Sequence, residues 1–563
     1  MAADLQRRLA VARGDEPADV VVRGGRVLSV FTREWLEADV AITDGWVAGL
    51  GTYEGAEVLD ASGRYVVPGF IDAHVHLESS KLLPDEFARL VLPLGTTAVV
   101  ADPHEIANVL GTDGVHWLLD SSAEVPLDVY FMASSCVPAS VFESPRRSLT
   151  VGDLEGLLRR RRVIGLAEMM NFPGVVSGDE HELAKLRLAR HVDGHAPGLL
   201  GPELQAYAAA GIHSDHEAST PEEGRERLRA GMWLLIREAS AARNLHALLP
   251  LVQEYGPQRI AFCTDDREPE HIAADGHLNA MVRDAVAFGI APEDALVLAS
   301  FNAAAYHGLD HLGALAPGRQ ADLLVLPDLE RFIPDLVLKR GRPVAEIPQA
   351  SVPEWVKHTV RIGALGPEVF RIPLDGGGAA RVIGLVPGQI ITAALIDEPA
   401  RRGGEAIADP ERDLAKIAVI ERHLGTGRIG LGFVRGFGLR RGALASTLSH
   451  DAHNIVVVGT DDTSMAFAVR RLANIGGGIV VVDGAHALAE LPLPVAGIVS
   501  DAPLADVVTG SEAIVHAAAD LGCTIEAPFQ LLAFLALSVI PSLKITDRGL
   551  VDVDRFELVP LQV

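Results

Sequence analysis

Short runs of apolar residues recur through the first half of the chain, and most of them end in a histidine or a carboxylate. They are partly β-branched or aromatic, which is typical of strands buried on both faces of a parallel sheet. Eight candidate strands follow in order: VVPGFIDAHVH, TTAVVADPHE, DVYFMASSC, RVIGLAEMMN, RHVDGHAP, GIHSDHE, GMWLLIREAS and RIAFCTDD. Because the carboxyl ends of such strands meet at one face, the pattern predicts a (β/α)8, TIM-like barrel with metal at that face.

Two β-rich blocks flank this region. Short alternating runs fill residues 18–66, with hairpin signals at Gly24-Gly25 and Asp44-Gly45. A similar small block returns at Gly313–Leu326. We therefore expect one small β-sandwich domain that is assembled from both sides of the barrel.

The composition of the chain changes beyond about residue 350. Glycine-rich turns at 376–378 and 476–478 separate apolar runs such as HNIVVVG and GGIVVV, with the helix-like DTSMAFAVRRLANIG between those two runs. This pattern predicts a further α/β domain. The expected division of the chain is 1–66 for the first part of the small β domain, 67–310 for the catalytic barrel, 311–349 for the return segment of the small β domain, and 350–563 for the C-terminal α/β domain.

Composition narrows the functional classes. The formal net charge of −26 argues against nucleic acid or an anionic membrane as a partner, because both need a basic surface. Cys136, Cys263 and Cys523 are isolated, which fits a reducing cytosol and argues against a zinc–thiolate site. The first residues lack the apolar core of a signal peptide, and the late apolar run Leu531–Ile540 is too short to span a membrane. We expect a soluble cytoplasmic protein.

His74 and His76 are the first candidate metal ligands. They lie two apart at a strand end, so both side chains leave on one face and can hold one cation. A pair of this kind is common by chance, and two hydrogen-bonded polar residues are the alternative. The later strand-end residues His195, His216 and Asp265 favour the metal site.

Glu168 closes the fourth strand, where a carboxylate can bridge two cations; a solvated or salt-bridged acid is the alternative. His195 and His216 complete the shell of a second cation, unless they are hydrogen-bonded core histidines. Asp265 is suited both to bind metal and to carry a proton, and Asp266 is expected to support it.

These residue types predict hydrolysis at an electrophilic carbon. Two divalent cations lower the pKa of a shared water towards neutrality and so supply a hydroxide nucleophile. A carboxylate at the eighth strand takes the proton and delivers it to a leaving nitrogen. No organic cofactor is needed.

Several strings narrow the chemistry further. The HVH that follows VVPGFID, the late strand-end aspartate and the closing GALAPGRQADLLVL resemble the amidohydrolase superfamily. Longer strings resemble the bacterial adenine deaminase family over essentially the whole chain: GFIDAHVHLESS, DPHEIANVLG, EMMNFPGVV, DGHAPGL, GIHSDHE, CTDDREPEHI and SHDAHNIVVVG. The resemblance implies hydrolytic deamination of adenine to hypoxanthine and ammonia by a metal-activated hydroxide, in purine salvage or catabolism.

The resemblance also implies a ligand set and its cofactors. The first metal would be held by His74, His76 and Asp265, the second by His195 and His216, with Glu168 as the bridge in place of the carboxylated lysine of many superfamily members. Two divalent ions per chain are expected, with manganese first and iron or zinc as alternatives. Adenine is the expected small-molecule partner, and assembly as a homo-oligomer is expected.

Two pairs of polar residues near the barrel mouth are further candidates. His104 and Glu105 follow the second strand and are expected to contact substrate or hold an accessory cation, with a structural role as the alternative. Arg237 and Glu238 end the seventh strand, where they can bind the purine edge or form salt bridges with neighbours.

Glu217 follows a metal-site histidine and is expected to protonate a ring nitrogen, which makes the reacting carbon more electrophilic. Asn171 is a candidate substrate contact. His450 and His453 belong to a loop of the C-terminal domain, and they are either part of a lid over the active site or surface residues.

Two other functions stay open at this point. One is an amidohydrolase of the same fold that acts on a different nucleobase or a cyclic amide, because fold alone does not define a substrate. The other is a metal-free barrel that serves as a scaffold. Such proteins lose ligands first, and this chain retains the whole predicted set.

Overall fold

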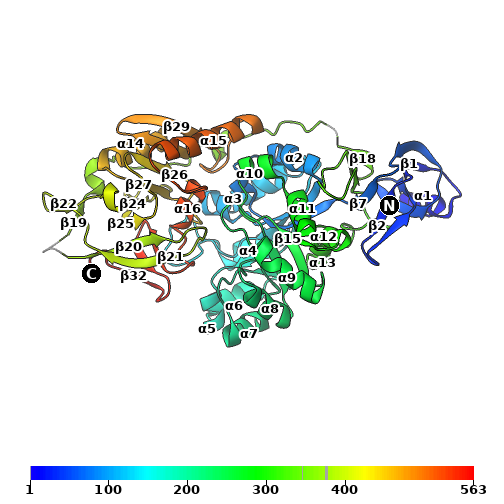
Figure 1. Cartoon of the computed structure of the whole chain (residues 1–563), viewed down its shortest axis with the longest axis horizontal. Helices are drawn as coiled ribbons and strands as arrows, with labels where there is room; N and C mark the ends of the chain where they lie inside the picture. Colours follow the sequence, from blue (N-terminus) through cyan, green and yellow to red (C-terminus); the bar gives the residue numbers. More distant parts are fainter. Residues whose placement is uncertain (1, 345, 375–377) are drawn as a thin grey trace.

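The computed structural model describes residues 2–344, 346–374 and 378–563, so Gly376 and Gly377 of the first predicted glycine-rich turn lie outside the described residues. The molecule is elongated (Figure 1). Its N-terminal strands lie at one end and the C-terminal half at the other. Between them lies the α/β region that contains the predicted metal ligands, which we call the central region.

All eight predicted strands are present in this central region. They are β8 (Phe70–Val75), β9 (Thr96–Ala101), β10 (Asp128–Ala133), β11 (Val163–Met169), β12 (Val192–Gly194), β13 (Ser214–Asp215), β14 (Trp233–Arg237) and β15 (Ile260–Cys263). Helices follow or separate them: α2 (Pro84–Val91), α3 (His104–Ser121), α4 (Val151–Leu158), α5 (Phe172–Ser177), α6 (Glu180–Leu186), α7 (Gly201–Ala209), α8 (Pro221–Arg229), α9 (Leu245–Tyr255), α10 (Pro269–Asp275), α11 (Leu278–Phe288), α12 (Pro292–Leu298) and α13 (Phe301–Tyr306).

The strands do not close into one continuous barrel, which corrects the prediction. They form two parallel sheets, with orders β12-β11-β10-β9-β8 and β13-β14-β15. Between β15 and β8 there is one bridge, Val75 with Asp265. Between the other two edges the amide of His213 donates to the carbonyl of Val192 at 3.1 Å. β12 and β13 are only three and two residues long, so they have few backbone groups with which to continue a ladder.

The first predicted strand is two strands separated by Gly69. β7 (Tyr65–Pro68) joins a flanking sheet, whereas β8 turns into the central region and carries the HxH pair. A Cβ on Gly69 would lie 2.1 Å from Oγ1 of Thr97, so only glycine lets the chain pass this close to β9.

The flanking strands pair across the central region, as expected for a domain made from both sides. A six-stranded sheet has the order β18-β17-β16-β7-β2-β3, and a four-stranded sheet has the order β5-β4-β1-β6. Their bounds are β1 (Ala18–Arg23), β2 (Arg26–Ser29), β3 (Glu34–Glu37), β4 (Asp39–Thr43), β5 (Trp46–Gly51), β6 (Gly55–Asp60), β16 (Leu323–Leu326), β17 (Leu336–Lys339) and β18 (Arg342–Pro343), after a first helix α1 (Ala2–Arg13). Both sheets contribute to one apolar core, for example Val22 and Val40 from one and Val66 and Leu323 from the other.

The C-terminal half is built on an eight-stranded sheet of order β21-β20-β25-β24-β27-β26-β28-β29. Its strands are β20 (Ala380–Leu385), β21 (Thr392–Asp397), β24 (Leu414–Ile420), β25 (Ile429–Arg435), β26 (Ala443–Ser446), β27 (Ile455–Gly459), β28 (Gly478–Asp483) and β29 (His486–Pro492). Smaller strands are β19 (Ile372–Pro373), β22 (Arg401–Arg402), β23 (Glu405–Ala406), β30 (Leu543–Thr546), β31 (Gly549–Asp552) and β32 (Glu557–Val559), and the helices are α14 (Asp462–Asn474), α15 (Leu504–Asp520) and α16 (Pro528–Phe534).

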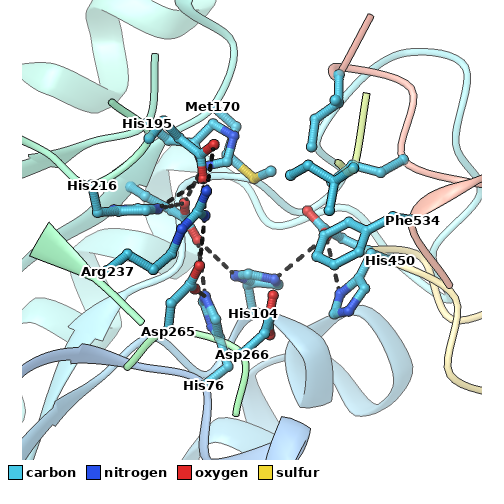
Figure 2. A pocket seen from close by; sticks show the side chains of 16 residues that line it. His76, His104, Met170, His195, His216, Arg237, Asp265, Asp266, His450 and Phe534 are labelled. Atoms are coloured by element: carbon cyan, nitrogen blue, oxygen red, sulfur yellow. Dashed lines mark hydrogen bonds and ion pairs between the residues drawn. The ribbon is translucent and has the colours of Figure 1, made fainter. Parts of the chain in front are cut away.

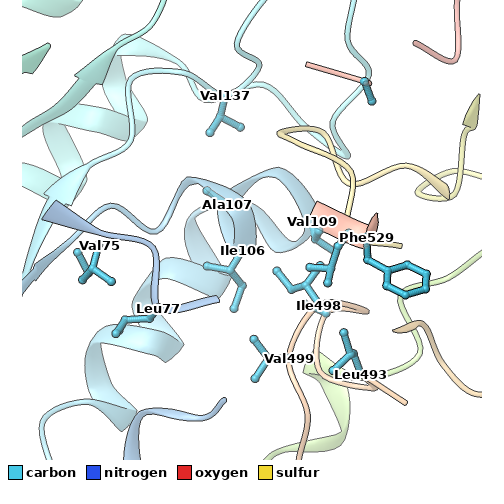
Figure 3. Packing of buried hydrophobic residues seen from close by; sticks show 14 of the residues in the cluster. Val75, Leu77, Ile106, Ala107, Val109, Val137, Leu493, Ile498, Val499 and Phe529 are labelled. Atoms are coloured by element: carbon cyan, nitrogen blue, oxygen red, sulfur yellow. The ribbon is translucent and has the colours of Figure 1, made fainter. Parts of the chain in front are cut away.

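Both faces of this sheet are apolar, and each is covered differently. Alternate residues of β24 point to opposite faces, so Ala418 joins the core under α14 and Ile417 joins the core shared with α15 and α16. That second core runs on into the central region, where Ile106 and Val109 of α3 pack near Phe529 and Ile498 (Figure 3). A continuous apolar core therefore holds the C-terminal half against the central region.

In the part of the chain that the structure describes, no helix combines the length and apolar character that a membrane crossing requires.

Candidate metal centre and pocket

His74 and His76 lie at the carboxyl end of β8, and their Nε2 atoms are 3.2 Å apart. The Nδ1 atom of His76 lies 3.1 Å from the carbonyl oxygen of Asp102, and a carbonyl can only accept, so the ring proton is on Nδ1. Its Nε2 therefore presents a lone pair to the interior of the cluster. This orientation is the one that a metal ligand requires.

Glu168 lies at the end of β11 between two groups of histidines. Its Oε1 atom is 3.3 Å from Nε2 of His76. Its Oε2 atom is 2.7 Å from Nδ1 of His195 and 3.3 Å from Nε2 of His216. The two oxygens of one carboxylate thus face different histidines, which is the geometry of a bridging ligand.

Asp265 follows β15 and completes the first group. Its Oδ1 atom lies 3.0 Å from Nε2 of His76 (Figure 2) and 3.6 Å from Nε2 of His74. The residue has a φ of 54°, in the left-handed region that non-glycine residues seldom adopt. Backbone strain of this kind is found where surrounding structure imposes a functional side-chain position.

The donor set fits divalent cations. Buried charges need a partner or a metal. None of the six predicted ligands is more than 5% exposed as a residue: His74, His76, Glu168, His195, His216 and Asp265. Nδ1 of His195 and Nε2 of His216 face Glu168, whereas the opposite ring nitrogens of both have no hydrogen-bond partner in the described part of the chain. Imidazole and carboxylate donors are the mixture that manganese, iron and zinc accept.

The electrostatics show that this point attracts positive charge. Burial lowers the pKa of His195, but the carboxylates of Glu217 and Glu168 outweigh it and raise the pKa to about 9. Burial likewise lowers the pKa of His74, while Asp193, Asp265 and Glu168 raise it to about 10. Where no metal is bound, protons take the place of cations in this cluster.

A pocket opens beside the cluster, and both halves of the molecule line it (Figure 2). From the central region come His76, His104, Glu168, Met170, His195, His216, Glu217, Arg237, Asp265 and Asp266, and from the C-terminal half come Ile390, His450, Asp451, Phe534, Leu537 and Ile540. The C-terminal residues form one wall, which is largely apolar.

Arg237 takes the salt-bridge alternative. Its guanidinium pairs with Glu217, with one contact at 3.1 Å, and its Nη1 atom lies 2.7 Å from Oδ2 of Asp265. It still lines the pocket. Glu238 does not, because neighbouring strand residues point to opposite faces. Its carboxylate instead accepts from the amide of Leu245 at 3.1 Å, so the position of Glu238 does not fit the substrate contact predicted for it.

Asn171 also lies outside the pocket, which its neighbour Met170 reaches. The side-chain oxygen of Asn171 accepts from the amide of Gly174 at 3.1 Å and so caps α5. Its amide group donates to Glu182 at 3.1 Å. A capping asparagine is a local structural requirement that a polar residue near a strand end does not reveal.

His450 and His453 are not surface residues, so that alternative is wrong. They are 7% and 0% exposed, and both face Glu105. The ring of His450 stacks on Phe534 with centroids 4.5 Å apart (Figure 2). His104 lies in the same pocket, between Glu168 and Asp451. The lid function of the loop stays a prediction.

Asp193 is a buried neighbour of the cluster that the sequence analysis missed. It lies on β12 two residues before His195, so strand periodicity alone could have pointed to it. Its Oδ2 atom is 3.9 Å from Nδ1 of His74, and Tyr306 donates a hydrogen bond to its Oδ1. Burial raises the pKa of Asp193, but the histidines, His74 foremost, lower it to about 2. Asp193 is thus an ion-pair neighbour of His74, and we expect it to orient that ring.

Asp193→Asn is expected to weaken metal binding by roughly 10–100-fold, because residues that orient a metal-ligating histidine have effects of this size. The measurement is the competition of a chromophoric chelator for bound metal. Asp128→Asn is the matched control. Asp128 is a carboxylate beside Lys339 at the start of β10, the end of the strand away from the cluster. Equal metal retention in both variants would remove the orienting role of Asp193.

Two known protein families match successive parts of the chain. A profile described as "Amidohydrolase family" matches residues 65–361, and one described as "Adenine deaminase C-terminal domain" matches residues 389–557. The first spans the central region with all six predicted ligands. The second spans the C-terminal half that supplies the apolar wall of the pocket.

Curated relatives match along the whole length. The chain is 46% identical to an adenine deaminase of Desulfatibacillum aliphaticivorans, covering 98% of this chain and 99% of the relative. It is 49% identical to an adenine deaminase of Brucella suis biovar 1, covering 97% and 95%. Among solved structures, an N-acetyl-D-glucosamine-6-phosphate deacetylase from Mycobacterium smegmatis matches 58% of this chain and 100% of its own length, with a TM-score of 0.44 and 19% identity.

Proposed function

The chain belongs to the adenine deaminase family of amidohydrolases, and we propose that adenine is hydrolysed to hypoxanthine and ammonia in the pocket beside Glu168. The position of Glu168 is the main support for this choice of site, because its two carboxylate oxygens face different histidines. The pocket borders that carboxylate directly.

The proposed ligand set follows the distances. His74, His76 and Asp265 would hold one cation, His195 and His216 the other, and Glu168 would bridge them. Manganese is the expected metal. The finer fold assignment, a TIM-like (β/α)8 barrel, belongs to the same proposal and is supported by eight parallel strands in sequential order.

When bound, the cations would acidify a water, so that a nucleophile forms at neutral pH. The chain's own residues handle the protons. Asp265 would take a proton from the attacking water and pass it to the leaving nitrogen, since its carboxylate borders the pocket. Its Oδ2 atom is fixed by Arg237, which keeps Oδ1 directed into the cluster.

Glu217 is the proposed donor to a ring nitrogen of adenine. It lies in the pocket wall and is paired with Arg237 through both oxygens. Met170, Ile390 and Phe534 supply an apolar surface for the flat faces of a base.

Ammonia release from adenine is the direct test. Protein grown with manganese is expected to release ammonia rapidly from adenine and to lose the activity on treatment with a chelator, since the cations generate the nucleophile. Adenosine, guanine and cytosine are assayed alongside, because hydrogen bonds to the ring edge discriminate strongly against the wrong base.

No release from any of these bases, by protein that contains metal, would contradict the substrate and leave a hydrolase of the same superfamily. Assembly as a homo-oligomer and a cytoplasmic location are also proposals, supported by the family resemblance and by composition respectively.

A further inference from the structure

A second cluster of buried donor atoms lies across the pocket from Glu168. His104 and Glu105 come from the start of α3, and His450 and Asp451 come from the loop after β26. None of the four belongs to the ligand set proposed above. All are at most 7% exposed.

Successive donor atoms in this cluster are spaced as neighbouring ligands of one ion are. Nε2 of His104 is 3.5 Å from Oδ1 of Asp451, which is 3.7 Å from Nδ1 of His450. That Nδ1 atom is in turn 3.6 Å from Oε1 of Glu105. In a tetrahedral site with ligand distances of about 2.1 Å, neighbouring donors lie about 3.4 Å apart. His104, Glu105 and His450 also offer ligand atoms that all lie within 4.8 Å of one another.

His104 is oriented as a ligand would be. Its Nδ1 atom lies 3.1 Å from Oδ2 of Asp102, whose other oxygen accepts from Ser134 at 2.7 Å. A carboxylate that binds the proton on Nδ1 leaves the lone pair on Nε2, the atom that faces Asp451. A histidine with its far nitrogen on a carboxylate is the usual arrangement at metal sites.

Oε1 of Glu105 accepts a hydrogen bond from Ser79 at 2.8 Å, but one oxygen of each carboxylate in this cluster lacks a partner among the described residues. Oε2 of Glu105 and Oδ2 of Asp451 are buried and have no hydrogen-bond partner there. The ion pairs formed by these two residues are with histidines only, namely His104, His450 and His453. Buried carboxylates that keep an oxygen without a hydrogen bond are costly, and a cation bound by their other oxygens lowers that cost.

We propose that His104, Glu105, His450 and Asp451 bind a third divalent transition-metal cation, separate from the two at Glu168. Two imidazoles and two carboxylates suit zinc in particular. Because two ligands come from the central region and two from the C-terminal half, the ion would connect these halves at the pocket wall.

His453 has a different function in this arrangement. The amide of Ser449 donates to its Nδ1 at 3.3 Å, so the ring proton is on Nε2, which lies 3.8 Å from Oε2 of Glu105. A nitrogen that carries a proton cannot be a ligand. His453 instead positions Glu105 on the side away from the ion.

The test counts metals in the zinc-reconstituted holoenzyme by mass spectrometry, after free metal has been removed. Asp451→Asn and Glu105→Gln are each expected to lose one zinc per chain relative to the unchanged protein. Glu182→Gln is the matched control, a buried glutamate that pairs with Lys185 outside this cluster. It is expected to lose none.

This difference of one zinc does not depend on whether the two cations at Glu168 bind. If they do not bind, the total zinc content falls by the same amount in every variant. Anomalous diffraction from crystals of the unchanged zinc enzyme avoids any folding defect of the variants. A peak enclosed by the four donors supports the site. No peak there, or equal zinc in all variants, overturns it, and a rise in KM for adenine with unchanged zinc would make the cluster a substrate contact instead.

Discussion

Glu168→Gln is expected to lose bound metal and deaminase activity together. The substitution keeps the shape of the side chain but removes the negative charge and points an amide N–H at one group of histidines. Metal-ion catalysis contributes several kcal/mol to a reaction barrier, so kcat should fall by on the order of 10³-fold or more. The measurements are metal per chain and ammonia release from adenine.

Glu182→Gln provides the comparison for this variant. Glu182 is a buried glutamate, 5% exposed, that pairs with Lys185 outside the metal cluster. It should keep its metal and its turnover. If Glu168→Gln also had normal metal content and full turnover, the bridging assignment would be wrong.

Arg237→Met is expected to destabilise the metal-free protein by roughly 3–5 kcal/mol, the usual cost of removing one partner from a buried ion pair. Arg237 is 4% exposed and lies between Glu217 and Asp265. Without the guanidinium two buried carboxylates lose the cation that they share and keep only histidines as partners. Urea unfolding at neutral pH, in the presence of a chelator, measures the loss.

The deficit should depend on pH in a defined direction. Burial raises the pKa of the Asp265 carboxyl, but Arg237 and the histidines outweigh it and hold the pKa well below the ordinary value. A depressed carboxyl pKa stabilises the fold above the unfolded pKa, and that contribution is lost as pH falls through the folded pKa. Arg237→Met lacks part of this contribution. The difference in the free energy of unfolding between the unchanged protein and the variant should therefore be largest at neutral pH and should shrink in acid.

Arg243→Met separates this effect from the general loss of an arginine. Arg243 is partly exposed and lies 4.0 Å from the exposed Glu526. Its removal should change the free energy of unfolding by about 0.5 kcal/mol or less. A similar small change for Arg237→Met would mean that Glu217 and Asp265 do not depend on the guanidinium.

Strand positions and the ligand set were accessible from the sequence, for a physical reason. A buried parallel strand needs a continuous apolar run, and a polar residue at its end is therefore conspicuous, as for Glu168 at the end of β11. The structure brings the six predicted ligands into one cluster. The (β/α)8 prediction held for the number and order of the strands but not for closure, because pairing between β12 and β13 depends on only a few backbone groups.

Side-chain direction and long-range contacts were not accessible. Glu238 and Asn171 follow strands as the true pocket residues do, yet one binds the backbone of α9 and the other caps α5. The apolar wall formed by Ile390 and Phe534 comes from a part of the chain far from the ligands in sequence. The hydrophobic periodicity of the central strands and that of the C-terminal half do not indicate that these two parts of the chain are in contact.

The division of the pocket between two halves of the chain has a consequence for how such an enzyme can change. The proposed donors to the cations at Glu168 come from the central strands, whereas Ile390, Phe534, Leu537 and Ile540 of the opposite wall come from the C-terminal half. Substitutions in that wall alter the shape offered to a base without touching any of these donors. The proposed cation donors and the shape of that wall are therefore encoded in separable stretches of the gene, and either can diverge while the other is conserved.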